Sequence, residues 1–255
     1  MKRSVQHSFE LLYLLVLKEL KIRYKNSFLG YLWAIANPIA FALVYYFAFK
    51  LIMRVQLQNY SVFLLTGLFP WAWISNSLIR GTTCYKNNAF LIKKVKVNIA
   101  ILPLSIVFYE MIHFFLALPI LMLFLKFTEN IFFFEWLWQI PLMILLQLNF
   151  IYPIVLISSL VNSYIHDIEY IIGIFLSLLF FLTPIVYPIS MIPPKYLVYF
   201  KSNPLALLIK NWRSTFFSGY INSNDYFITL FIAFIFSILA FLVYRKSHFK
   251  LGELL

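Results

Sequence analysis

The chain has 255 residues, of which 63% are hydrophobic and 12% are charged, and its formal net charge is +12. Soluble domains carry roughly 25% charged residues, so this composition excludes a soluble globular protein and predicts a polytopic membrane protein. A single cysteine, Cys84, excludes a disulfide framework and a cysteine-based metal cluster. We assign the excess of cations to the cytoplasmic side of a membrane protein rather than to nucleic-acid binding.

Residues 1–29 predict an amphipathic helix that lies in the membrane interface. Lys18, Lys21 and Lys25 recur at helical spacing on one face, and apolar side chains occupy another face. A signal peptide is excluded, because no small-residue cleavage site follows the apolar stretch and a run of charged residues comes instead.

Six apolar segments are candidates for transmembrane helices, each of which needs about 20 apolar residues. The predicted spans cover residues 31–49, 60–79, 99–125, 136–161, 170–187 and 226–244. The fold class that follows is an all-α polytopic membrane protein with one transmembrane domain, 1–255. Within it, 1–29 form the interfacial helix, 30–182 most of spans one to five, and 225–255 span six and a tail.

Residues 183–224, between spans five and six, are rich in proline and hold apolar pieces too short to cross a bilayer. Irregular backbone at membrane depth is tolerated only where protein or water covers it. We therefore expect re-entrant or surface-lying outer helices here, with half-helices at 205–209 and 212–217, capping a cavity.

The distribution of Lys and Arg predicts that both termini are cytoplasmic. With the N-terminus inside, 14 basic residues lie on the inner side and 7 on the outer side, as the positive-inside rule requires.

Chemical motifs are sparse. None of the six glycines opens a Gly-x-x-x-x-Gly-Lys loop, so this chain does not hydrolyse ATP by that route, and no catalytic or metal-binding set is predicted. Glu110 and His113 share a face of span three. They could form a proton relay or metal site, or simply face the bundle interior and pair with each other or a neighbouring helix; a di-metal site would need a second carboxylate–histidine helix.

Three further features keep two interpretations each. His166 and Asp167, between spans four and five, could cap a helix or contact a cytoplasmic partner. The basic stretch 90–103 could lie against anionic lipid or form a short helix pushed by a soluble motor. Aromatic residues, 20% of the chain, could form an interfacial belt or line a path for sugars.

Four short motifs in order resemble the membrane subunit of ABC-2-type polysaccharide exporters, which move O-antigen, capsule and teichoic-acid chains. They are RYKNSFLGYLWAIANP (23–38), GLFPW (67–71), Asp167-Ile168 followed by FLTPIVY (181–187), and NPL (203–205) with Arg213 beyond it. The chain departs from the family at His166, where arginine is usual, and at Lys210-Asn211, where glutamate is common.

The resemblance implies a homodimer that forms a channel for a lipid-linked polysaccharide in the bacterial inner membrane. It also implies two copies of a separate ATPase subunit that binds ATP and Mg²⁺, with no cofactor on this chain. On this basis the channel-lining candidates are Tyr45, Tyr46, Phe49, Phe175, Phe180, Phe181 and Tyr187. The ATPase-coupling candidates are Lys86, Phe90, Lys93, Lys94, Lys96, His166 and Asp167.

The same resemblance assigns a third group to the interfacial helix and the outer gate. Gly30 allows a sharp turn into the bilayer, because glycine accepts unusual dihedral angles, and Pro38 bends span one. The candidates of this group are Arg23, Tyr24, Gly30, Trp33, Pro38, Pro184, Pro204 and Arg213.

Other classes remain as alternatives. A membrane enzyme of glycan or lipid assembly would need convergent polar groups at one membrane face. An ion-coupled transporter would need midplane carboxylates on repeated, broken helices, where only Glu110 qualifies. An ABC-2 exporter of a drug or lipid would share the fold with a different substrate.

Overall fold

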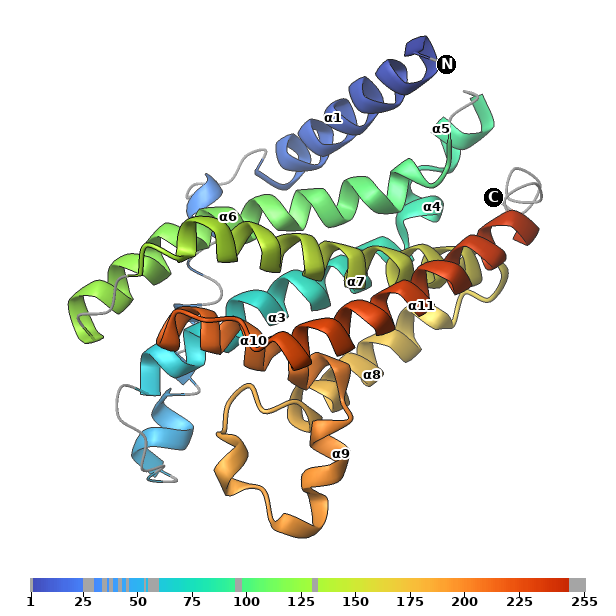
Figure 1. The fold of residues 1–255 in the computed structure, drawn as a ribbon. Coiled ribbons are helices and arrows are strands. Elements are labelled where there is room, and N and C mark those ends of the chain that lie inside the picture. Colours follow the sequence, from blue (N-terminus) through green and yellow to red (C-terminus); the bar gives the residue numbers. More distant parts are fainter. Residues whose placement is uncertain are drawn as a thin grey trace.

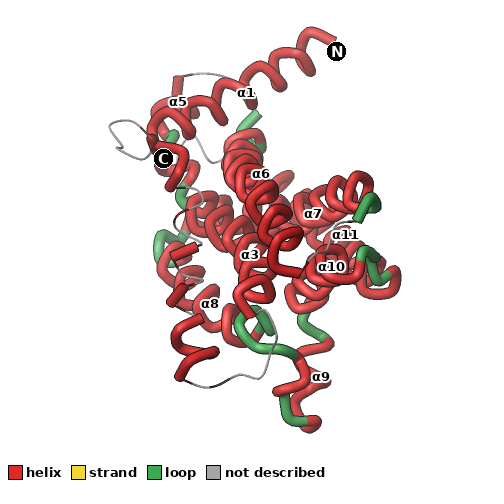
Figure 2. Tube along the Cα trace, turned by 90° about the vertical axis from the view of Figure 1, so that its left-hand side faces the viewer, coloured by secondary structure: helices red, strands yellow, loops and turns green. Residues whose placement is uncertain are grey.

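A computed structural model describes residues 2–24, 30–33, 36, 39–40, 43–44, 46–52, 54, 60–94, 98–129 and 133–247. These residues form helices joined by turns, with no β-strand among them (Figures 1 and 2). The α-helices are α1 (Lys2–Tyr24), α3 (Tyr60–Thr82), α4 (Cys84–Asn87), α5 (Ala89–Lys94), α6 (Ile101–Glu129), α7 (Trp136–Tyr164), α8 (Ile168–Leu182), α9 (Leu197–Lys201), α10 (Pro204–Ser218) and α11 (Ser223–Ser247).

Four of these helices are long and apolar enough to cross a membrane: α3, α6, α7 and α11. They confirm the polytopic class and match four of the six predicted spans closely. Seven of the 19 residues of the first predicted span, 31–49, lie outside the described residues and divide it into short pieces. A 3₁₀ turn at Gly30–Leu32 and a π-helix at Tyr46–Ile52 are the elements described there. The total of six spans therefore stays a prediction.

The fifth predicted span is shorter than expected. Helix α8 has 15 residues and ends at Leu182, five residues before the predicted end of the span. Thr183 has φ −109° and ψ 132°, because a residue that precedes proline is pushed out of the helical region. Pro184 therefore ends α8, and the chain continues through two 3₁₀ turns, Ile189–Met191 and Pro194–Tyr196, and the short helix α9.

The expected pair of half-helices at 205–209 and 212–217 is wrong: α10 is one continuous helix of 15 residues. The Asn203 side chain accepts a hydrogen bond from the Leu205 amide, and Pro204 takes the first helical position. Lys210 and Asn211 interrupt the apolar pattern but not the helix, since Asn211 is buried and accepts a hydrogen bond from the Asn222 amide at 3.0 Å.

The core is built where α3, α7 and α10 meet. Gln147 of α7 is fully buried; its amide donates to the Pro70 carbonyl at 3.0 Å and accepts from the Trp212 indole at 2.5 Å. Gly81 lets α3 approach α7 closely, because a Cβ there would lie 2.2 Å from Val155 Cγ1. Polar residues inside apolar helices thus fix how these three elements pack.

The bundle has two distinct ends. One end, called here the basic end, carries α4, α5, the turn between α7 and α8, and the last turn of α11; the N-terminus lies on the same side (Figure 1). The Tyr244 hydroxyl contacts Asn98 at 3.0 Å there. The opposite end carries the start of α3, the 183–203 segment and the α10–α11 turn, where the Trp136 indole donates to the Thr215 carbonyl at 2.8 Å.

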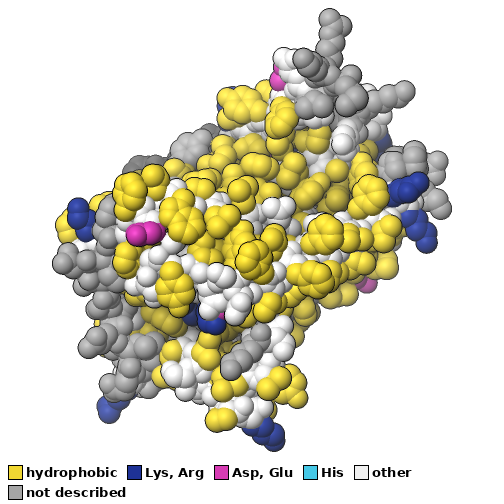
Figure 3. Space-filling view, viewed as in Figure 1, with side chains coloured by type: hydrophobic (Ala, Val, Ile, Leu, Met, Phe, Trp, Pro, Cys, Tyr) yellow, Lys and Arg dark blue, Asp and Glu magenta, His cyan; other side chains and the backbone are white. Residues whose placement is uncertain are grey.

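The outer face is apolar. Figure 3 shows hydrophobic side chains over most of the described part of one face. Helix α11 contributes Phe227, Phe231 and Phe234, each more than half exposed. Apolar exposure on this scale is what a lipid-facing helix requires.

Candidate transport pocket and polar network

A pocket of about 370 Å³ lies between α3, α6 and α8. Seven of its 19 lining residues are aromatic. Trp71 of α3 packs on Phe180 of α8 with ring centroids 5.8 Å apart, and Trp73 stacks on Phe114 of α6 at 5.4 Å. Its polar lining residues are Arg23, Ser75, Asn76, Glu110, His113 and Ser177. The pocket thus combines ring faces with hydrogen-bonding groups, as sites for small polar molecules do.

The predicted channel-lining residues divide into groups. Phe180 and Phe181 line the pocket, and the Tyr187 hydroxyl donates to the Phe181 carbonyl. Phe175 is 56% exposed on the outer face of α8, away from the pocket lining. Tyr46 lies beside Tyr60, with ring centroids 6.4 Å apart.

For two of the predicted channel-lining residues the structure describes no side chain. Tyr45 is outside the described residues, and for Phe49 only the backbone is described. The pocket also has aromatic lining that was not predicted as channel lining, namely Trp33, Phe69, Trp71, Trp73 and Phe114.

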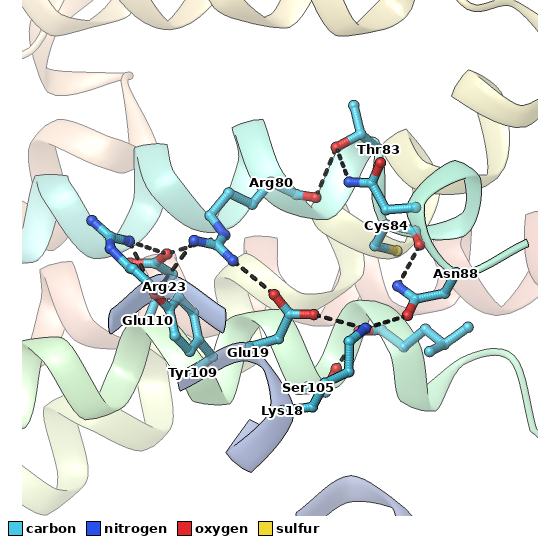
Figure 4. Close-up of polar contacts among 12 residues, drawn as sticks. Lys18, Glu19, Arg23, Arg80, Thr83, Cys84, Asn88, Ser105, Tyr109 and Glu110 are labelled. Atoms are coloured by element: carbon cyan, nitrogen blue, oxygen red, sulfur yellow. Dashed lines mark hydrogen bonds and ion pairs between the residues drawn. The ribbon is translucent and has the colours of Figure 1, made fainter. Parts of the chain in front are cut away.

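A network of charged side chains joins α1, α3 and α6 next to the pocket (Figure 4). Glu110, only 2% exposed, lies 3.5 Å from Arg23 Nη1 and 3.7 Å from Arg80 Nε. Both guanidinium groups also donate to the Tyr109 hydroxyl, at 3.1 and 3.3 Å. A buried carboxylate therefore holds two cations from different helices, and removal of its charge would leave them facing each other.

The network continues along α1 toward the basic end. Glu19 Oε2 accepts from Arg80 Nη2 at 2.8 Å, and Lys18 lies 3.2 Å from the other Glu19 oxygen. Lys18 Nζ donates to Asn88 Oδ1 at 2.6 Å, between α4 and α5. We call these seven residues the polar network: Lys18, Glu19, Arg23, Arg80, Asn88, Tyr109 and Glu110.

Glu110 and His113 face the bundle interior, which the sequence allowed as one of two interpretations. His113 Nδ1 lies 3.0 Å from the Tyr109 carbonyl oxygen, which only accepts hydrogen bonds, so this nitrogen is the donor. Glu110 pairs with cations of neighbouring elements. Among the described residues, no three His, Cys, Asp or Glu side chains come together as metal ligands.

The predicted coupling residues that the structure describes lie at the basic end. Lys86 of α4 lies 3.6 Å from Glu169 at the start of α8. This ion pair joins the two loops that were predicted to contact the ATPase. Phe90 is 73% exposed, and Lys94 Nζ lies 4.2 Å above its ring. Lys93, His166 and Asp167 are also exposed; Lys96 lies outside the described residues.

The third predicted group is spread over both ends. Arg23 belongs to the polar network, Tyr24 is the last residue of α1, and Trp33 lines the pocket. Gly30 has a φ of +50°, in the left-handed region that favours glycine. Pro38 lies outside the described residues.

Arg213 forms a clamp at the opposite end. Its guanidinium donates to the carbonyl oxygens of Pro184, Ile185 (2.5 Å) and Phe63 (3.5 Å), and it lies 3.7 Å from the centre of the Phe63 ring. Gly67 leaves room for it, because a Cβ there would be 2.8 Å from Arg213 Nη2.

Two other side chains hold the same segment. The Tyr60 hydroxyl donates to the Val186 carbonyl, and the Asn203 amide donates to the Leu182 carbonyl at 3.2 Å. The end of α8 and residues 183–186 are thus fixed to α3 and α10 by donors from three places in the chain. Pro204, by contrast, acts at the start of α10.

Cys84 is almost fully buried at the start of α4. Burial raises the pKa of its thiol well above the ordinary range. The neutral thiol is a poor nucleophile, so we assign Cys84 a packing role.

Residues 10–217 match the family model described as ABC-2 type transporter. The chain belongs to this family. Among its relatives, a Klebsiella pneumoniae protein named O-antigen export system permease protein RfbA is 38% identical over 258 residues, covering 100% of this chain and 98% of that protein. A Myxococcus xanthus protein of the same name is 34% identical, covering 81% and 80%, and the Escherichia coli polysialic acid transport protein KpsM is 29% identical, covering 82% of each.

Family membership and four apolar helices together make this ABC-2 transporter chain a multi-pass membrane protein. From the sequence, Lys18 was predicted only as part of the basic face of the interfacial helix, and no individual role was predicted for Glu19, Arg80, Asn88 or Tyr109. Apart from the adjacent pair Lys18 and Glu19, the contacts that join these residues span 29 to 70 residues of chain, a separation that local patterns do not reveal. Glu110, an acid inside an apolar run, was the one visible signal.

Proposed function

We propose that this chain is the membrane-spanning permease subunit of an ATP-driven exporter of a lipid-linked polysaccharide, with O-antigen as the first candidate substrate. The observation that carries the proposal is the full-length similarity to a protein named O-antigen export system permease. The pocket adds support, because aromatic rings beside hydrogen-bonding groups suit the apolar faces and hydroxyls of sugars.

The energy source in this proposal is a separate ATPase subunit that binds ATP and Mg²⁺, as membership of the ABC-2 family implies. The basic end offers a docking surface for it, with Phe90 as an exposed apolar anchor and Lys93 and Lys94 beside it. Aromatic residues, phenylalanine among them, are enriched at protein–protein interfaces. This end would face the cytoplasm of a bacterial inner-membrane protein, with both termini on that side.

A second copy of the chain completes the proposed channel. Apart from Leu176 and Phe180, the side chains of α8 are at least partly exposed, among them Phe175 and Phe181. We propose that this face, together with span one, meets its equivalent in the partner copy around the glycan path, and that residues 183–224 form its outer gate.

The experiment is a deletion of the gene, with plasmid-borne wild-type chain as the matched control. Surface polysaccharide is measured by antibody staining, and lipid-linked glycan is extracted from the inner membrane. Loss of the surface pool with accumulation of the lipid-linked pool on the cytoplasmic leaflet is the expected result.

Two other results contradict the proposal in different ways. If both pools disappear, glycan synthesis has failed and a membrane enzyme of glycan assembly explains the chain better. If neither pool changes, the substrate is not this glycan, and an exporter of a drug or lipid takes its place.

A further inference from the structure

Two neighbouring residues of α1 contact two different parts of the bundle. Lys18 donates to Asn88, between α4 and α5, at 2.6 Å, and Glu19 accepts from Arg80, near the end of α3, at 2.8 Å (Figure 4). Lys18 and Glu19 are adjacent in the chain, and their side chains also contact each other at 3.2 Å. A displacement of Asn88 is therefore transmitted to Arg80, and the reverse.

The Asn88 end of this connection is fixed to the helices of the proposed docking surface. The side-chain amide of Asn88 donates to the Cys84 backbone carbonyl at 2.8 Å. The backbone carbonyl of Asn88 accepts from the Leu91 backbone amide at 3.0 Å. Asn88 thus moves with both α4 and α5. Phe90, which is 73% exposed on α5, is two residues away.

The Arg80 end leads to the pocket. Arg80 contacts Glu110 and Tyr109 of α6, and Arg23 reaches the same two residues from the last turn of α1. Arg23 and Glu110 line the pocket. The polar network therefore runs without interruption from the basic end to a wall of the pocket.

Apolar packing keeps α1 together as one body along this route. Val16 and Leu20 are buried against Tyr109 of α6, and Leu15 packs in a cluster with Cys84 and Tyr85 of α4. A helix held on one apolar side and connected by hydrogen bonds at several points along its length transmits a push as a rigid element rather than absorbing it.

We propose that α1 is the lever that couples the ATPase-facing helices α4 and α5 to the pocket, with Lys18 and Glu19 as positioning residues of transport. This inference rests on the proposed function. In it, force applied at α5 reaches Asn88, passes through Lys18 and Glu19 to Arg80, and shifts Arg23 and Glu110 at the pocket. Breaking the Lys18–Asn88 or Glu19–Arg80 contact then separates ATP hydrolysis from transport.

The experiment uses inverted membrane vesicles that contain the chain, its ATPase partner and lipid-linked glycan. ATP hydrolysis is measured as phosphate release, and transport as ATP-dependent protection of the glycan from an added glycosidase. The variants are Glu19→Gln, Lys18→Asn, Asn88→Lys and the exchanged pair Lys18→Asn with Asn88→Lys. The matched control is Glu10→Gln, which removes the same charge from an exposed position of the same helix, where Glu10 contacts Gln6 at 3.3 Å.

In each single variant of the lever we expect hydrolysis to stay within twofold of wild type and transport to fall at least fivefold. The exchanged pair restores a lysine–asparagine contact, but neither the Lys18–Glu19 contact nor the bond from residue 88 to the Cys84 carbonyl, so it should transport more than either single variant but less than wild type. If the lever variants transport like Glu10→Gln, or if hydrolysis and transport fall by the same factor, the contacts are structural ties and the proposal is overturned. If wild-type vesicles transport no glycan, the proposed function itself has failed.

If a single variant assembles poorly, a cross-linking experiment tests the same proposal. The double variant Lys18→Cys with Asn88→Cys lacks the hydrogen bond, and a short bifunctional maleimide can replace it while the buried native Cys84 stays unmodified. Recovery of transport on cross-linking supports the lever. Transport that stays low after complete cross-linking overturns it.

Discussion

At the scale of single residues, close packing depends on glycine at particular positions. Gly67 on α3 makes room for the Arg213 guanidinium, and a Cβ at this position would also be 3.3 Å from the Ile185 carbonyl oxygen. Gly173 on α8 is different, since nothing lies within 4 Å of an added Cβ. The two glycines form a natural pair for comparison.

Gly67→Ala should destabilise the protein, by about 1–3 kcal/mol, because the extra methyl group forces Arg213 or the backbone at Ile185 to move. Gly173→Ala should leave stability unchanged or raise it by roughly 0.5–1 kcal/mol, since alanine favours the helix over glycine. Thermal unfolding of the two purified variants in the same detergent measures the difference. Equal midpoints would show that the Arg213 slot is loose.

At the scale of elements, the sequence predicts the long helices well and their ends less well. Hydrophobic length alone places α3, α6, α7 and α11 within a few residues, because a spanning helix satisfies its own backbone in lipid. Pro184 was a visible reason to stop span five earlier than predicted. The continuity of α10 was not visible, because Asn211 breaks the apolar pattern yet is buried and hydrogen-bonded to a residue 11 positions away.

The candidate site was less predictable than the helices. Glu110 and the basic loops were noticed from composition, but their partners come from distant segments: Arg80 reaches Glu19 and Tyr109 across 61 and 29 residues. A single sequence shows which residues are charged but not which of them pair. The pocket aromatics show the same limit, because alternation of ring-bearing residues on a helix does not say which ring faces lipid.

The segment after α8 should open when Arg213 is replaced. Hydrogen bonds from charged donors contribute about 1.5–3 kcal/mol each, so loss of even one increases the open population roughly tenfold. Arg213→Met should therefore speed tryptic cleavage after the exposed Lys195 by at least that factor. Lys210→Met is the control, because it removes a cation of the same helix whose partner is Asp225 of α11, 2.5 Å away; equal cleavage rates in the two variants would argue against the clamp.

At the scale of the whole molecule, the two ends differ in chemistry and should lie on opposite sides of the membrane. The basic end exposes His166, and the opposite end exposes Tyr199, which is 73% accessible. Both positions are suited to a labelling test, because the native cysteine does not compete.

In intact spheroplasts, a membrane-impermeant maleimide should label Tyr199→Cys at once and His166→Cys only after permeabilisation. The wild-type chain should stay unlabelled from pH 7 to 9, since burial raises the pKa of Cys84 and the reactive thiolate does not form. The reverse pattern would invert the proposed orientation. Labelling of both variants before permeabilisation would place the two ends on one side.

The ion pair between Lys86 and Glu169 has a consequence for how a partner binds. Together with the packing of Cys84 and Tyr85 in one cluster with Leu156 and Leu160 of α7, it places α4 next to the turn between α7 and α8. A protein that touches one of these segments therefore meets the other at a high effective concentration. Two individually weak contacts then act as one bivalent attachment, with an avidity that neither reaches alone. If the two segments moved apart, the affinity of the partner would fall by far more than the contribution of one ion pair.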